Sequence, residues 1–142
     1  MTLPPRALVS PFDAIGGEPK IRAILEDLYT RIFDDALIGF LFAGHDKAHL
    51  VAMQTLFTRR MLGDRSAVYG GKPVPEAHAA LPILPGHFDR RHQLLREVLD
   101  AHAVAAFPRD FWLRIDLGLR DAILRTGAAR IEELRWRGDD ER

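Results

Sequence analysis

The strongest constraint on the fold is the spacing of apolar residues between proline and glycine breaks. After Gly16-Gly17-Glu18-Pro19, apolar side chains recur at three- and four-residue steps: Ile21, Leu25, Leu28 and Ile32. This spacing is the period of an α-helix, and a proline fits its first turn because the amides there have no partner within the helix. We therefore predict a helix from this start to about residue 33.

The same reasoning divides the rest of the chain into helices. We predict a helix at 47–62 behind Asp46, a short helix at 76–80, and long helices at 88–106 and 109–134. No segment alternates for long enough to favour a strand. The predicted fold is all-α, with an N-terminal arm at 1–11, one domain at 12–134 and a polar tail at 135–142.

Composition excludes several classes of protein. The 142 residues include no cysteine, so disulfide scaffolds and thiolate chemistry are excluded. Twenty basic residues balance twenty acidic ones, which argues against nucleic acid or an anionic membrane as a partner. The first residues lack a secretory pattern, and no apolar run is long enough to span a bilayer, so we expect a cytoplasmic location.

Three polar residues are candidates for a functional role, two of them on apolar helical stripes. Gln54 shares a helical stripe with Leu50, Phe57 and Met61, and Tyr29 lies on the stripe of the first long helix. Each could reach water or a backbone carbonyl, or could instead point a donor into a pocket. His78 stands among small residues, either as a surface or capping residue or as a ligand.

Familiar catalytic signatures are absent from the sequence. It contains no HExxH, GxGxxG, Walker-type or GxSxG motif. The pairs Arg59-Arg60 and Arg90-Arg91 have no interleaved aromatic residues, and we predict that both are solvated helix edges.

An ordered set of short motifs covers most of the chain between residues 12 and 99. The motifs are Phe12-Asp13-Ala14-Ile15-Gly16-Gly17, Leu28-Tyr29-Thr30-Arg31-Ile32-Phe33, Phe40-Leu41-Phe42, Met53-Gln54-Thr55-Leu56-Phe57, Met61-Leu62-Gly63-Asp64, Tyr69-Gly70-Gly71-Lys72-Pro73, Glu76-Ala77-His78 and Gly86-His87-Phe88-Asp89-Arg90. No single motif is specific, but their order and intervals resemble the truncated haemoglobins.

The resemblance implies a two-over-two helical sandwich around haem b. It implies that His78 is the proximal ligand of the haem iron and that Lys72 meets a propionate. It places Tyr29, Leu50 and Gln54 on the distal side. The residues implied to line the haem are Phe42, Phe57, Met61, Ile83 and Phe88.

The combination of Tyr29, Leu50 and Gln54 resembles the first class of this family, while some features resemble the third. In that class a Trp usually follows at a position where this chain has Arg91 and His92. His92, His49 or Met53 is a candidate for an internal sixth ligand of the iron.

The implied function is O₂ binding at haem iron, as in oxygen transport, with CO and NO as further ligands. A phenol and an amide suit this role because both donate hydrogen bonds. The alternatives are NO dioxygenation or a peroxidase-like reaction served by an unknown reductase, and a helical interaction module without haem. We expect a monomer or weak dimer.

Overall fold

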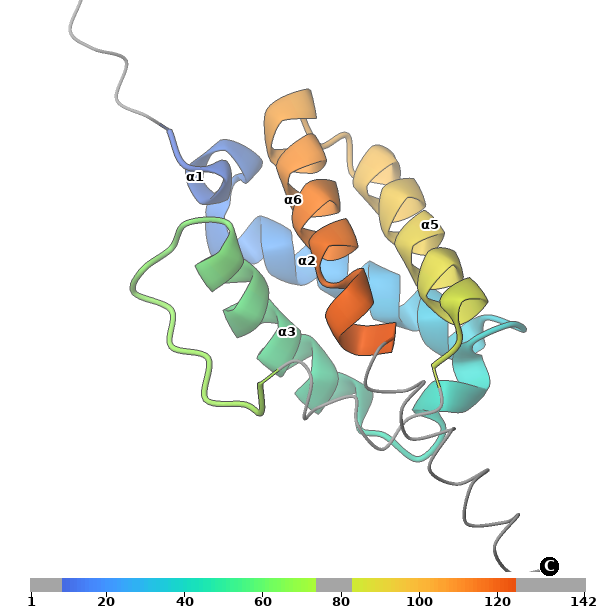
Figure 1. Cartoon of the computed structure of the whole chain (residues 1–142). Coiled ribbons are helices and arrows are strands. Elements are labelled where there is room, and N and C mark those ends of the chain that lie inside the picture. Colours follow the sequence, from blue (N-terminus) through green and yellow to red (C-terminus); the bar gives the residue numbers. More distant parts are fainter. Residues whose placement is uncertain (1–8, 74–82, 125–142) are drawn as a thin grey trace, which may run out of the picture.

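The computed structural model describes residues 9–73 and 83–124, and all the regular elements of these residues are helices (Figure 1). They are α1 (Pro11–Ile15), α2 (Gly17–Asp34), the 3₁₀ helix η1 (Gly39–Phe42), α3 (Lys47–Met61), α5 (Pro85–Ala101) and α6 (Ala106–Gly118). Helical turns resume at 120–124 after a break at Leu119. The all-α prediction is confirmed.

The helices form two packed pairs. α2 lies against α3, and α5 lies beside α6; α2 also contacts α5, and α1 contacts α6 (Figure 1). This is the two-over-two helical sandwich that the sequence predicted. In such an arrangement the inner faces of all four helices meet in one core.

Helix α2 supplies the centre of that core. Its buried residues follow the helical period: Ile21, Ile24, Leu25, Leu28, Tyr29 and Ile32. Leu95, Val98 and Leu99 of α5 pack against this face and are fully buried as well. Fully burying one aliphatic side chain contributes about 1.5–3 kcal/mol, so this contact between α2 and α5 is a main source of stability.

Two turns between helices need a residue with positive φ, which the spacing of apolar residues cannot predict. Gly16, at φ 110°, ends α1 and begins α2, and a left-handed residue there favours glycine. Ala103, at φ 53°, lies in the turn between α5 and α6. Because of this turn, α5 ends at Ala101 and α6 begins at Ala106, whereas the sequence predicted one helix to 106 and a new one from 109.

The short helix α1 was not predicted. Its signals are local: the Ser10 hydroxyl accepts a hydrogen bond from the Asp13 amide at 3.1 Å, and Pro11 occupies the first turn. The predicted helix at 76–80, the first eight residues of the arm predicted at 1–11, the last part of the predicted helix at 109–134 and the tail predicted at 135–142 lie outside the described residues.

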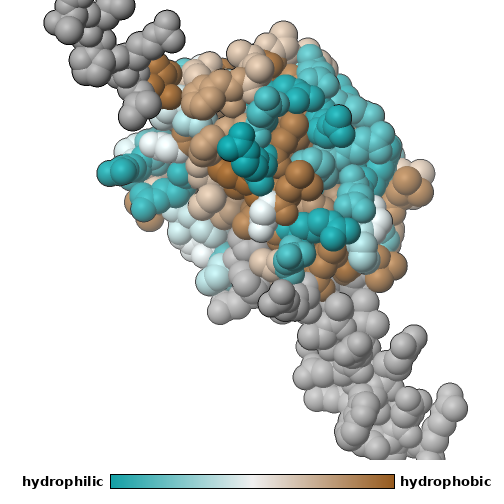
Figure 2. Space-filling model, turned by 45° about the horizontal axis from the view of Figure 1, so that its top comes forward, coloured by the Kyte–Doolittle hydropathy of each residue, from teal (hydrophilic) through white to brown (hydrophobic). Residues whose placement is uncertain are grey.

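The surface is mixed in character. Figure 2 shows one face, on which apolar residues lie between polar ones. Phe40, Leu37 and Phe107 are among the large apolar side chains with more than half of their surface exposed. Within residues 9–73 and 83–124, no helix has both the length and the apolar character required to cross a membrane.

Candidate functional site

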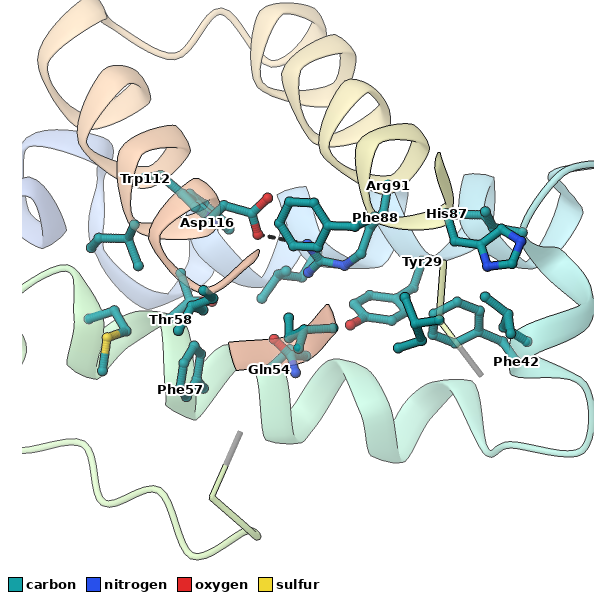
Figure 3. A pocket seen from close by; sticks show the side chains of 18 of the residues that line it. Tyr29, Phe42, Gln54, Phe57, Thr58, His87, Phe88, Arg91, Trp112 and Asp116 are labelled. Carbon is teal, nitrogen blue, oxygen red and sulfur yellow. Dashed lines mark hydrogen bonds and ion pairs between the residues drawn. The ribbon is translucent and has the colours of Figure 1, made fainter. Parts of the chain in front are cut away.

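A cavity of about 130 Å³ lies between the two helix pairs. All four long helices of the described chain contribute side chains to it, and most of these side chains are apolar or aromatic (Figure 3). The predicted site residues that line it are Tyr29, Phe42, Gln54, Phe57, Met61, Ile83 and Phe88. Residues from five segments of the sequence therefore meet at one place.

Tyr29 enters the cavity from α2. Its side chain is 3% exposed, and its ring meets the edge of Phe42 at a centroid distance of 6.1 Å. Phe33 also packs against Phe42, with the ring centroids 5.8 Å apart. This aromatic cluster fixes the direction of the Tyr29 ring, so that its hydroxyl points toward the interior of the cavity (Figure 3).

Gln54 reaches the same cavity from α3. Figure 3 shows its amide on the side of the cavity where the Tyr29 hydroxyl ends. One turn further along α3, Phe57 meets the edge of Tyr69 at 5.4 Å, and the Tyr69 hydroxyl donates a hydrogen bond to the Lys72 carbonyl at 2.9 Å. The amide of Gln54 and the phenol of Tyr29 are thus among the polar groups of a largely apolar cavity.

The structure does not bring every predicted residue to the cavity. Leu50 is half-buried and packs against the hydrophobic core, and the Lys72 side chain is exposed. Neither is among the residues that line the cavity. His78 lies outside the described residues.

The three candidate sixth ligands also lie apart from the lining of the cavity. His49 is exposed near the start of α3, where its backbone amide donates a hydrogen bond to the side chain of the N-cap residue Asp46. The His92 ring is held by Asp116, with Nδ1 2.7 Å from Oδ2, and Met53 does not line the cavity.

Arg91 is the main cavity residue that the sequence analysis missed. It was predicted to be a solvated helix edge, but its side chain is 23% exposed and lines the cavity. Its Nη1 donates to the Asp116 carboxylate at 2.7 Å, across from α5 to α6. The available signal was its place in the sequence, where related proteins of the third class carry a Trp. Asp116 gave no such signal.

The charges of Arg91 and Asp116 stabilise each other. Burial disfavours the charge on Arg91, but the Asp116 carboxylate and then the Tyr29 hydroxyl more than offset this, so the pKa of Arg91 lies above its ordinary value. Burial likewise opposes ionisation of Asp116, yet Arg91 and His92 hold the pKa of its carboxyl below its usual range. A charged guanidinium therefore lines the cavity that Tyr29 also enters.

Comparison with known proteins assigns this fold and cavity to a class. A sequence model of the bacterial-like globin family matches residues 10–123. The chain therefore belongs to the bacterial-like globin family.

Individual relatives refine this assignment to the truncated two-over-two globins. The chain is 34% identical over 99 residues to the group 1 truncated hemoglobin GlbN of Nostoc sp. (strain MUN 8820), covering 67% of this chain and 80% of the relative. It is 33% identical, with the same coverage, to GlbN of Nostoc commune. These matches confirm the predicted family, with group 1 relatives among them.

Solved structures show the same fold. The truncated hemoglobin of Tetrahymena pyriformis in the Fe(III) form superposes with a TM-score of 0.75 at 24% identity, covering 81% of this chain and 97% of that one. The 2/2 hemoglobin of Synechococcus sp. PCC 7002 gives 0.76 at 21% identity, covering 82% and 98%.

Globins bind haem with its iron, so haem is the cofactor of this chain. The described cavity fits such a group on chemical grounds. Phe42, Phe57 and Phe88 offer apolar surface for a flat macrocycle, and Tyr29 and Gln54 add polar groups to the same cavity.

Proposed function

We propose that this globin binds O₂ reversibly at haem b and that Tyr29 and Gln54 donate hydrogen bonds to the bound ligand. The observation that carries this proposal is the pairing of a phenol and an amide in one largely apolar cavity. When bound, ferrous haem with one axial histidine supplies an open coordination position for a diatomic molecule.

The chain's own residues determine how strongly such a ligand is held. O₂ on ferrous iron accepts hydrogen bonds, and Tyr29 and Gln54 carry the O–H and N–H groups that donate them. Each such bond contributes on the order of 1 kcal/mol, and the apolar surroundings strengthen it. CO and NO enter the same cavity as further ligands.

The remaining roles follow from position in the family pattern. His78 is the proposed axial ligand of the iron, and Lys72 the proposed partner of a propionate. Phe42, Phe57, Met61, Ile83 and Phe88 are the proposed apolar contacts of the macrocycle. Leu50 packs one turn before Gln54 on α3, and we assign it to the distal side, where it supports the position of that helix.

Absorption spectroscopy of the full chain tests this proposal. The haem-loaded protein is expected to show a Soret band that shifts when CO is added to the ferrous form. His78→Ala is expected to lose haem or this spectrum, whereas His49→Ala, which changes an exposed histidine, is expected to keep both. An unchanged ferrous–CO spectrum in His78→Ala would show that another residue holds the iron.

A further inference from the structure

All the sulfur of this chain is in methionine. The sequence has three Met residues and no cysteine. Met53 and Met61 both lie on α3, and Met1 is outside the described residues. A thioether is oxidised reversibly to a sulfoxide, which turns a flexible apolar side chain into a polar one. The surroundings of the two α3 methionines therefore decide where this reaction takes place.

Met61 lies at the rim of the cavity. It is the last residue of α3, it lines the cavity, and it is 38% exposed. Leu62, the next residue, lines the same cavity but is only 1% exposed. A small oxidant in water can therefore reach the Met61 thioether, whereas the neighbouring Leu62 is closed to solvent.

Met53 is an internal comparison on the same helix. It is half-buried and does not line the cavity. Its methyl group lies 2.6 Å from the position that a Cβ atom on Gly71 would occupy, so it packs against the loop at Gly71. An oxidant reaches this thioether less easily than the thioether of Met61.

A sulfoxide at Met61 changes a residue that we propose as an apolar contact of the macrocycle. The lining of the cavity is largely apolar, and Phe57 lies one turn earlier on α3. A polar group covered by an apolar surface costs free energy unless it finds a hydrogen-bond partner. Without haem, an exposed sulfoxide keeps its contact with water, and haem packed against it removes part of that contact. Oxidation therefore favours the haem-free form, with little effect on the fold itself.

We propose that Met61 is a reversible oxidation site for peroxides and that its sulfoxide weakens the retention of haem. A sulfur lone pair attacks one oxygen of hydrogen peroxide, so that an S–O bond forms and the O–O bond breaks. The hydrogen on the transferred oxygen passes to the departing hydroxide, which leaves as water. Sulfur is oxidised by two electrons and the peroxide is reduced by two. The proposal rests on the proposed function, because it requires Met61 to contact haem.

Peroxide treatment of the full-length chain tests the first part of this proposal. The haem-free protein is exposed to hydrogen peroxide, because haem itself reacts with peroxide, and the excess is removed with catalase. Peptide mapping by mass spectrometry then measures the gain of one oxygen atom at each methionine. Met61 is expected to be oxidised several times faster than Met53, in line with its greater exposure.

Haem retention tests the second part. Hemin is added to the oxidised and the untreated protein, and the rate of haem transfer to an excess of another apoglobin is followed by absorption. The oxidised protein is expected to lose haem roughly fivefold faster. Its urea unfolding midpoint without haem is expected to match that of the untreated protein. Methionine sulfoxide reductase is expected to restore slow haem loss, since the modification is reversible.

Two variants on α3 supply matched controls, each compared with itself before and after peroxide. Met61→Leu keeps an apolar side chain but has no sulfur at this position, so peroxide is expected to leave its rate of haem loss unchanged. Met53→Leu keeps Met61, so peroxide is expected to accelerate its haem loss as in the wild type.

Three results would overturn the proposal. Equal oxidation rates at Met53 and Met61 would show that the rim position does not select the site. Haem loss that stays slow after Met61 is fully oxidised would show that the sulfoxide does not disturb the haem contact. Peroxide-accelerated haem loss in Met61→Leu would place the sensitive group elsewhere. Failure of the untreated wild type to take up hemin would instead contradict the proposed function.

Discussion

The Arg91 guanidinium and the Asp116 carboxylate face each other between α5 and α6, with Nη1 2.7 Å from Oδ1. Their side chains are 23% and 8% exposed, and both residues line the cavity. The ion pair therefore belongs at once to the packing of two helices and to the wall of the site. A change in either residue should affect stability and ligand binding together.

Asp116→Asn should destabilise the fold by up to about 3 kcal/mol. Removing one partner of a buried ion pair leaves the other charge uncompensated, and the partial exposure of Arg91 reduces this penalty. The free energy of unfolding in urea at pH 7 measures it. Arg91→Met combined with Asp116→Leu should recover much of the loss, since neither ion then remains.

Asp89→Asn is the control for this prediction. Asp89 also pairs with an arginine, Arg120, but its side chain is 61% exposed, and exposed pairs contribute little. Its unfolding free energy should stay close to that of the wild type. Equal effects of Asp116→Asn and Asp89→Asn would mean that burial of the α5–α6 pair has no energetic consequence.

Gly71→Ala should destabilise the cavity wall, and Gly70→Ala should not. A methyl group on Gly71 would come within 2.5 Å of the Tyr69 hydroxyl and 2.6 Å of the Met53 methyl, whereas one on Gly70 meets nothing within 4 Å. Met53 can turn away, but Tyr69 is held by its hydrogen bond to the Lys72 carbonyl and by Phe57.

Crowding of this kind typically costs about 1–3 kcal/mol, and we expect a loss in that range for Gly71→Ala. Unfolding in urea and the rate of haem loss, each compared with Gly70→Ala, measure it. Both variants remove the same glycine flexibility from the unfolded chain, so that effect cancels. Identical behaviour of the two variants would show that Tyr69 moves freely.

Helical periodicity predicted the long elements well. The helix predicted at 47–62 is observed at Lys47–Met61, and the stripe of Ile21, Leu25 and Leu28 is the buried face of α2. Periodicity could not report the left-handed turn at Ala103, because alanine carries no local signal for positive φ. The predicted end of α5 and start of α6 were wrong for that reason.

The residues of the site were likewise predicted only in part. Gln54, Phe57 and Met61 share a helical stripe, and the structure brings all three to the cavity, whereas Leu50 of the same stripe packs against the core. Arg91 was wrongly predicted to be solvated, because its environment depends on Asp116, which lies 25 residues later and on another helix. Such a tertiary ion pair leaves no periodic trace in the sequence.

The Asp35 carboxylate should make stability depend on pH. Arg90 donates to it at 2.7 Å and, although burial opposes its charge, the Leu37 and Ile38 amides donate as well, so its pKa lies below the ordinary value. A lowered folded-state pKa stabilises the fold fully above the unfolded value, about 3.9, and this contribution is lost as the pH falls through the folded value.

Asp35→Asn should therefore lose on the order of 1 kcal/mol of unfolding free energy at pH 7, with a smaller difference from wild type below about pH 4. Urea titrations at several pH values measure this difference. Asp110→Asn, at a 58% exposed carboxylate, serves as the comparison. A difference between Asp35→Asn and wild type that stays constant down to acid pH would exclude the ionised carboxylate as its source.

Tyr29→Phe should speed the dissociation of O₂ from the ferrous protein by about five- to tenfold, because the loss of one donated hydrogen bond costs on the order of 1 kcal/mol. Stopped-flow displacement of O₂ by CO measures the rate. Tyr69→Phe removes the same atom from another tyrosine of the cavity, but that hydroxyl donates to the Lys72 carbonyl, so its rate should match the wild type. Gln54→Leu should act in the same direction as Tyr29→Phe. Equal rates for Tyr29→Phe, Tyr69→Phe and wild type would mean that the Tyr29 hydroxyl does not reach the ligand.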